Sequence, residues 1–223
     1  MHREELIDIY DEQMNLLGTA PRSQAHREGL WHQTFHCWIV SRPDKIWLQR
    51  RGIHVETHPN KLDISSAGHL LSGERPKDGI REIEEELGLQ VNFDKLTKLF
   101  TAKKVSDRPG YINREFTATY LLETDKKLSE LKLNPEEVSG LYEVCIDDLI
   151  NLFNRKVSKV YASGLILGDN GQFSLQTGSF GICDFTPHSA DYYLKILNTA
   201  KRYLTNAKAC LLYTSPSPRD LST

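Results

Sequence analysis

The segment of residues 68–89, GHLLSGERPKDGIREIEEELGL, constrains this chain more than any other because it crowds four glutamates onto one predicted helix. Like charges at helical spacing repel by roughly 0.2–0.5 kcal/mol per i,i+4 pair. Pro76 is expected near the helix start and Gly88 at its C-terminal cap. At 100° per residue, one face carries Glu82, Glu85 and Glu86, and the opposite face carries Ile80, Ile83 and Leu87.

A buried aliphatic back with three convergent carboxylates in front is typical of a site for a hard divalent cation. Mg²⁺ prefers oxygen ligands and usually shares the phosphates of its substrate. Glu84 points away from the other three and is expected to be a surface charge. On the spacing alone, a solvated acidic face is the favoured explanation of the pattern, because runs of charge usually have that cause.

The bulk composition is that of a water-soluble globular chain. It has 223 residues, 39% of them apolar and 26% charged, with a net charge of −2, so no overall basic field points to nucleic acid. Its four cysteines form no C-x-x-C pair, which favours a reducing, cytoplasmic setting over a disulfide framework. No signal peptide and no membrane-spanning run is recognised.

Alternating apolar residues and turn signals predict a strand-rich chain with few helices. The expected strands cover 5–12, 14–22, 34–40, 45–51, 64–71, 96–105, 116–124 and 140–146, followed by a hairpin over 161–178. Asp147 is expected to cap a short helix, and the last helix is expected over 189–206. The resulting division is a lead-in of strands over 1–29, a main domain over 30–165, a hairpin and helix extension over 166–208, and a disordered or artefactual tail over 209–223.

The glutamate segment resembles the Nudix box. The matching positions are Gly68, Glu74, Arg81, Glu82, Ile83, Glu85, Glu86, Gly88 and Leu89, but six residues, not seven, separate Glu74 from Arg81. The resemblance implies an α+β fold, an α/β/α sandwich with a mixed sheet in which the box forms a loop–helix–loop. It also implies Mg²⁺- or Mn²⁺-dependent hydrolysis of a diphosphate, with Glu82, Glu85 and Glu86 as metal ligands and Glu86 also catalytic. Gly68, Glu74, Arg81 and Gly88 are then structural.

From about residue 16 to residue 149 the chain is similar to the Nudix branch that contains isopentenyl-diphosphate isomerase. His26, His32 and His69 fall where that isomerase has metal-binding histidines, although surface or hydrogen-bonded histidines remain an alternative. Glu115 matches a metal-binding glutamate and is a candidate general base, while Asn113 replaces a second one. Arg51 falls at a diphosphate contact, so Arg51 and His69 are the candidate substrate-binding residues.

Ala67 is the departure that separates the two chemistries of this branch. The isomerase has its catalytic cysteine immediately before the Gly-His pair, and an alanine can neither donate nor accept a proton. Cys37 is not an evident substitute, because a strand cysteine is more often an inert buried residue. We therefore expect a hydrolase of nucleoside or prenyl diphosphates, with an isomerase or a non-catalytic diphosphate sensor as alternatives. The expected partner is a small-molecule diphosphate, with no nucleic acid or membrane and with a possible homodimer.

Overall fold

The computed structural model describes residues 4–213, with side chains described up to residue 206. The strands are β1 (Leu6–Tyr10), β2 (Leu16–Pro21), β3 (Trp31–Ser41), β4 (Lys45–Arg51), β5 (Leu62–Asp63), β6 (Ser66–His69), β7 (Leu96–Arg108), β8 (Tyr111–Thr124), β9 (Val138–Cys145), β10 (Val160–Leu167) and β11 (Phe173–Phe180). The helices are α1 (Arg22–Glu28), α2 (Arg81–Leu87), α3 (Ile146–Phe153) and α4 (Ala190–Tyr213).

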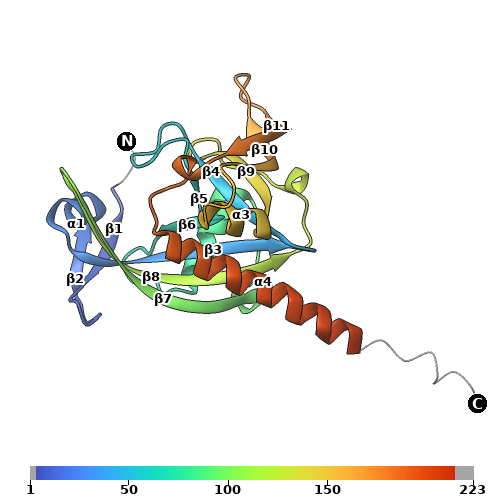
Figure 1. The fold of residues 1–223 in the computed structure, drawn as a ribbon. Helices are drawn as coiled ribbons and strands as arrows, with labels where there is room; N and C mark the ends of the chain where they lie inside the picture. Colours follow the sequence, from blue (N-terminus) through green and yellow to red (C-terminus); the bar gives the residue numbers. More distant parts are fainter. Residues whose placement is uncertain (1–3, 214–223) are drawn as a thin grey trace, which may run out of the picture.

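Strand β3 lies at the centre of one mixed sheet (Figure 1). The main path runs β11-β10-β9-β4-β3-β1-β2, and β6 and β8 also pair with β3. The β3–β8 pair is parallel along ten residue pairs, from His32↔Glu115 to Ser41↔Thr124, whereas β6 runs antiparallel to β3. Residues 34–37 of β3 therefore have neighbours on both β6 and β8.

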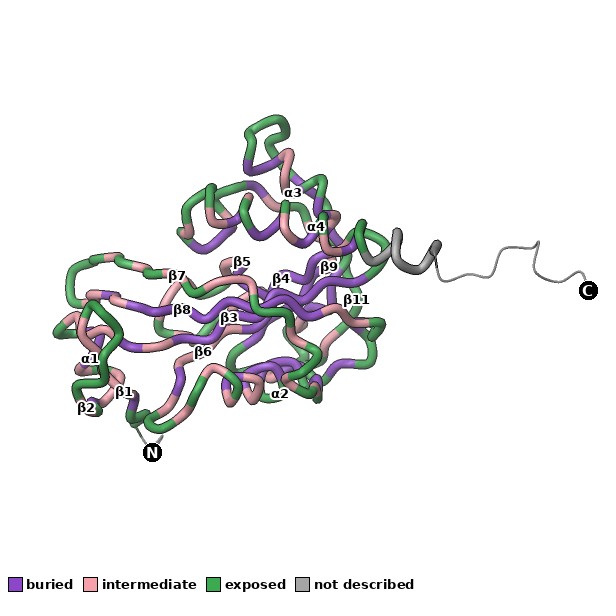
Figure 2. Tube along the Cα trace, turned by 90° about the horizontal axis from the view of Figure 1, so that it is seen from below, coloured by how far each residue is buried: buried purple, intermediate pink, exposed green. Residues whose placement is uncertain are grey.

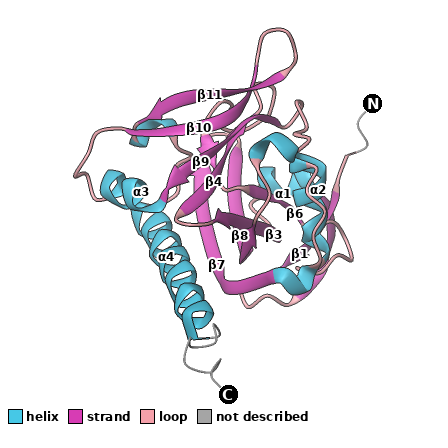
Figure 3. Ribbon diagram, turned by 90° about the vertical axis from the view of Figure 1, so that its right-hand side faces the viewer, coloured by secondary structure: helices cyan, strands magenta, loops and turns pink. Residues whose placement is uncertain are grey.

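Helices cover both faces of this sheet, so the expected α/β/α sandwich is confirmed. Figure 2 shows α2 on one side of the buried strands and α3 and α4 on the other, and Figure 3 shows α4 running along the sheet. Side chains alternate along β3: Phe35 and Cys37 pack in the core beneath α2, whereas Trp38 and Val40 pack in the core beneath α3 and α4.

The helix of the glutamate segment starts later than expected. Pro76 lies ahead of a 3₁₀ turn (Asp78–Ile80), and α2 begins only at Arg81. The Asp78 carboxylate accepts the Arg75 N–H at 2.8 Å, which favours a turn over an early α-helical start. Gly88 ends α2 in the left-handed conformation, with φ 65°, as predicted.

Two other local expectations need correction, and one helix was missed. The N-cap of α3 is Cys145 without a side-chain bond, and Asp147 instead pairs with Lys201 of α4 at 2.5 Å, because it lies inside the first turn. Helix α1 was not predicted; its seven residues are too short for a periodic signal. Helix α4 continues to Tyr213, into the segment expected as a tail, and residues 214–223 lie outside the described part. Among described residues, no helix is both long and apolar enough to cross a membrane.

Candidate active site

Strand β6 brings the glutamates of α2 against the sheet. Gly68 faces α2, and a Cβ added to it would lie 2.0 Å from Cδ of Glu82. Only glycine therefore allows the Glu82 carboxylate to lie this close to the strand. The next carboxylate along the helix, Glu86, accepts a hydrogen bond from the backbone N–H of Ala67 at 3.1 Å.

The structure places Glu82 and Glu86 in buried positions, where they are 8% and 5% exposed. Glu85 lies at the surface, with 52% of its side chain exposed. Glu84 is exposed and accepts a hydrogen bond from Gln90, as a surface residue would. The glutamate segment is thus only partly a solvated face, since the carboxylates of Glu82 and Glu86 are buried.

Arg81 connects the loop and the helix of this segment through hydrogen bonds. Its Nε donates to Glu74 at 2.8 Å, its Nη1 donates to Glu82 at 2.7 Å and to Glu85 at 3.0 Å, and its Nη2 donates to the carbonyl of His69 at 2.9 Å. Glu74 therefore lies next to the arginine although one residue is missing between them. The 3₁₀ turn before α2 spans the shortened loop, so the register of the three glutamates on α2 is unaffected.

Burial dominates the electrostatics of the two inner carboxylates. It raises the pKa of Glu82 to about 7, although the Arg81 charge opposes the shift. Burial and the neighbouring charge of Glu82 raise the pKa of Glu86 to about 8. A cation between these groups would favour their charged forms. Arg81 occupies one oxygen each of Glu82 and Glu85, and the other oxygen of each makes no hydrogen bond to a described residue. Carboxylate oxygens are the ligands that Mg²⁺ and Mn²⁺ prefer. With Arg81 bonded to Glu82 and Glu85, the three glutamates do not form a close group of ligand atoms in the described part of the chain.

A second cluster, of three histidines, lies on the opposite face of β6, the face of the sheet that α4 covers. The ring nitrogens of His26, His32 and His69 lie within 4.8 Å of one another, and Nε2 of His26 lies 3.1 Å from Nε2 of His69. A cavity of about 390 Å³ opens beside His26, lined by Glu4, Glu5, Arg22, Ser23, Glu56, Gly110 and Tyr111.

The hydrogen bonding of His32 fixes which nitrogen faces the cluster. Nδ1 of His32 lies 2.8 Å from the carbonyl of Leu30, which can only accept, so Nδ1 carries the proton. Nε2 then presents a lone pair, and it is buried without a partner among the described residues. A backbone carbonyl that holds the far nitrogen is the usual arrangement of a metal-binding histidine.

The parallel pairing of β3 with β8 places Glu115 directly beside His32. Asn113, two residues earlier on the same face of β8, has a buried Oδ1 without a described partner. Burial alone would raise the pKa of Glu115, but the charges of Lys104 and of the nearby histidines outweigh it and lower that pKa. Burial lowers the pKa of His26 to about 4 and that of His32 as well, so at neutral pH these rings are neutral and Lys104 is the effective cation.

These imidazole nitrogens, with the Glu115 carboxylate, fit a first-row transition metal such as Mn²⁺, Fe²⁺ or Zn²⁺ better than Mg²⁺. The unpartnered Nε2 of His32 and Oδ1 of Asn113 support that fit, because buried polar atoms are seldom left without a partner. The candidate substrate-binding residue His69 thus lies within this cluster.

Arg51 lies at the end of β4, where it is held by its own loop. Its Nε donates to the Thr57 carbonyl at 2.8 Å, its Nη2 donates to the Thr57 hydroxyl at 3.2 Å, and its Nη1 pairs with Asp63 at 3.2 Å. Asp63 in turn accepts from the Thr186 hydroxyl at 2.9 Å and lies 3.4 Å from Nε2 of His188.

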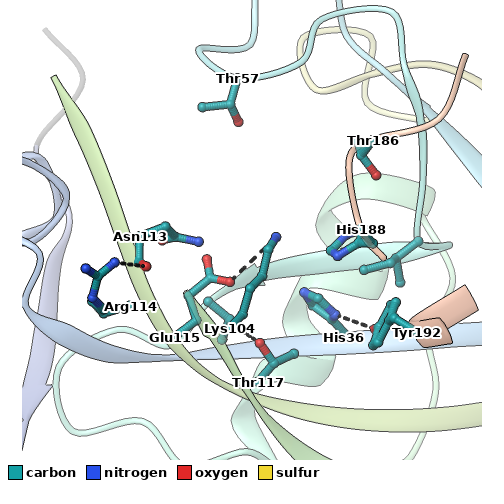
Figure 4. Close-up of polar contacts among 12 residues, drawn as sticks. His36, Thr57, Lys104, Asn113, Arg114, Glu115, Thr117, Thr186, His188 and Tyr192 are labelled. Atoms are coloured by element: carbon teal, nitrogen blue, oxygen red, sulfur yellow. Dashed lines mark hydrogen bonds and ion pairs between the residues drawn. The ribbon is translucent and has the colours of Figure 1, made fainter. Parts of the chain in front are cut away.

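The segment before α4 therefore reaches the same region as the sheet residues. Figure 4 shows Thr57, Thr186, His188, Lys104 and Glu115 turned toward one another, with His36 and Tyr192 beside them. Nδ1 of His36 bonds the Tyr192 hydroxyl at 2.9 Å. Nothing in the local spacing of Asp63, His188 or Lys104 marks them as site residues, so they could not be predicted from the sequence.

Ala67 and Cys37 lie on opposite faces of the sheet. Ala67 packs against the core beneath α3 and α4, on the side of His36, whereas Cys37 is fully buried in the core beneath α2. Burial raises the pKa of the Cys37 thiol far above its ordinary value. Cys37 therefore cannot supply the thiol that position 67 lacks.

The NUDIX domain family profile matches residues 30–163. An uncharacterised Nudix hydrolase of Clostridium acetobutylicum is 36% identical over 197 residues, covering 87% of this chain and 96% of that protein. The chain belongs to the Nudix family. It is a Nudix hydrolase by its match to the family profile and to this relative.

More distant relatives of this Nudix hydrolase confirm the expected branch. An isopentenyl-diphosphate Delta-isomerase of Clavibacter michiganensis is 27% identical over 148 residues, covering 66% of this chain and 75% of that enzyme. A crystal structure of a Deinococcus radiodurans protein superposes with a TM-score of 0.52 at 24% identity, covering 68% of this chain and 90% of that one. That likeness shows the fold.

Proposed function

We propose that this Nudix hydrolase uses Mg²⁺ or Mn²⁺ to cleave a phosphoanhydride bond of a small-molecule diphosphate. The observation that carries the proposal is the pair of buried carboxylates, Glu82 and Glu86, that α2 presses against Gly68 and Ala67. Burying two like charges this close is costly unless a cation joins them.

In this proposal Glu82, Glu85 and Glu86 hold the metal, which neutralises phosphate charge and activates a water molecule when bound. Arg81 keeps Glu82 and Glu85 oriented through its two bonds from Nη1. Glu115 accepts a proton or adds a ligand from the side of His32. Arg51 keeps N–H groups beyond those given to Thr57 and Asp63, and these can reach a phosphate.

The histidine cluster is proposed as a second metal site of the same enzyme. His26, His32 and His69 would hold the ion, with Glu115 beside them. Ala67 argues against isomerisation, because the chain has no thiol there. An intact set of box glutamates argues against a purely sensing module.

A substrate screen with the purified full chain tests the proposal. Nucleoside di- and triphosphates, dinucleotides and prenyl diphosphates are each incubated with Mg²⁺ or Mn²⁺, and released phosphate, pyrophosphate and monophosphates are measured. We expect metal-dependent turnover of at least one class. Absence of turnover across the panel, with a metal-free and a Glu86→Gln sample for comparison, would contradict the proposal.

A further inference from the structure

Two adjacent lysines of β7 point to opposite faces of the sheet. Nζ of Lys103 donates to the carbonyl of Glu12 at 2.6 Å and lies 5.2 Å from the ring centre of Trp31. Lys104 is paired in register with Glu115, and its Nζ lies 3.9 Å from Oε2 of Glu115. That distance is too long for a hydrogen bond, so the Lys104 ammonium stays near Glu115 without being bound by it.

The ammonium of Lys104 is directed into the space framed by Glu115, His188 and Thr57 (Figure 4). About a third of the Lys104 side chain remains exposed. Thr57 belongs to the loop that Arg51 anchors through two bonds. Lys104 and Arg51 therefore approach the same space from β7 and from the end of β4.

Two more basic residues lie close to this space. Arg108, near the tip of the β7–β8 hairpin, contacts the His58 ring of the loop that carries Thr57. The pKa of His58 is lowered by burial and by the charges of Arg108 and Arg51, with Lys104 contributing more weakly. Of the carboxylates here, Asp63 is bonded by Arg51, Thr186 and His188, and Glu56, next to Thr57, is exposed. Three positive charges, those of Lys104, Arg51 and Arg108, therefore lie around this space, and among the described residues only Arg51 is held in a close ion pair.

We propose that Lys104 is a substrate-binding residue that contacts a phosphate oxygen on the Glu115 side of the site, facing Arg51. An ammonium held 3.9 Å from a carboxylate can form a short charge-assisted bond to a phosphate without leaving Glu115 unpaired. A diphosphate is the ligand class that these three cationic side chains fit, whatever organic group it carries. The proposal rests on the hydrolase function proposed above and adds a residue from β7 to it.

The test compares Lys104→Met with Lys103→Met in the full chain. For a diphosphate that the parent turns over with Mg²⁺, we expect Lys104→Met to raise KM and the inhibition constant of inorganic pyrophosphate by about tenfold to hundredfold, because a bond to a charged group is lost. Lys103→Met should leave both constants within about twofold of the parent, because its side chain lies on the other face. Lys104→Arg should restore part of the affinity.

A second pair of variants separates phosphate binding from mere neutralisation of Glu115. In a Glu115→Gln background, pyrophosphate binding is measured by calorimetry with and without Lys104→Met. A loss of affinity on adding Lys104→Met supports the proposal, since no carboxylate is left to neutralise. Equal pyrophosphate affinities with and without Lys104→Met in that background, with thermal unfolding unchanged, overturn it. Failure of the parent itself to turn over any diphosphate would count against the hydrolase function, a separate outcome.

Discussion

The carboxylate of Glu82 lies where a side chain on Gly68 would begin, since a Cβ there would be 2.0 Å from Glu82 Cδ. Gly68→Ala must therefore displace the carboxylate or the strand. We expect a loss of about 1–3 kcal/mol in the free energy of unfolding and a large loss of Mg²⁺-dependent turnover. Urea unfolding and steady-state kinetics measure the two effects. Unchanged turnover in a fully folded variant would show that the carboxylate position does not matter.

The inner carboxylate Glu86 and the outer Glu84 form a matched pair for testing the metal site. Glu86→Gln should lower turnover by at least about 100-fold, because a charged oxygen that holds the cation is lost. Glu84→Gln should keep parental activity, since Glu84 is exposed and bonds only Gln90 among the described residues. Activity is measured at saturating substrate over a range of Mg²⁺ concentrations. Equal activity of both variants would point to the solvated-face interpretation.

The histidine cluster should retain a transition metal through purification. His32→Gln removes the lone pair that Nε2 presents to His26 and His69, so the amount of tightly bound Mn²⁺, Fe²⁺ or Zn²⁺ per chain should fall by about tenfold or more. His54→Gln, in the exposed loop after β4, is the control. Elemental analysis after dialysis gives the metal content. A metal content that His32→Gln leaves at the parental level would favour purely hydrogen-bonded histidines.

Asp63 should make stability depend on acid pH. Burial would raise its pKa, but bonds from His188 and the charge of Arg51 lower it well below the ordinary 3.8. Because the folded pKa is the lower one, the stabilisation is complete above 3.8 and is lost as the pH falls toward the folded value. Asp63→Asn should therefore cost about 2–4 kcal/mol at neutral pH and progressively less in acid.

Urea unfolding between about pH 7 and pH 3 measures this difference, with the exposed Asp125→Asn as control. If Asp63→Asn were as stable as the parent at pH 7, the bonds from Arg51, Thr186 and His188 would contribute nothing net.

Ala67 should prevent proton exchange on isopentenyl diphosphate. The alanine methyl transfers no proton, and Cys37 lies in the core on the other face of the sheet. Incubation in D₂O should leave isopentenyl diphosphate free of deuterium, as measured by mass spectrometry. Deuterium incorporation above that of a Glu115→Gln sample would restore the isomerase interpretation.

The local sequence predicts the Nudix box but not the contacts between segments that are distant along the chain. Gly88, the strand Lys45–Arg51 and the exposed position of Glu84 follow from turn chemistry and periodicity, and the structure agrees. The late start of α2 could not be predicted from Pro76. The local sequence allows either an α-helical start or a 3₁₀ turn, and the hydrogen bond from the Arg75 N–H to the Asp78 carboxylate favours the turn.

The pairing of Asp63 with Thr186 and His188 joins residues more than 120 positions apart, so periodicity says nothing of it. The position of Lys104 could likewise not be predicted from the sequence, because only the β7–β8 register shows that Lys104, and not Lys103, lies beside Glu115.

The four-residue strand β6 has a consequence for both clusters at once. Gly68 opens toward the glutamates of α2, and the next residue, His69, completes the histidine cluster on the reverse face. Consecutive strand residues alternate in direction, so a slip of β6 by one position would turn His69 toward the glutamates and Gly68 toward the histidines. Both clusters therefore depend on the same antiparallel register of β6 with β3, in which Phe35 is paired with Gly68. A shift of that register would disrupt the two clusters together.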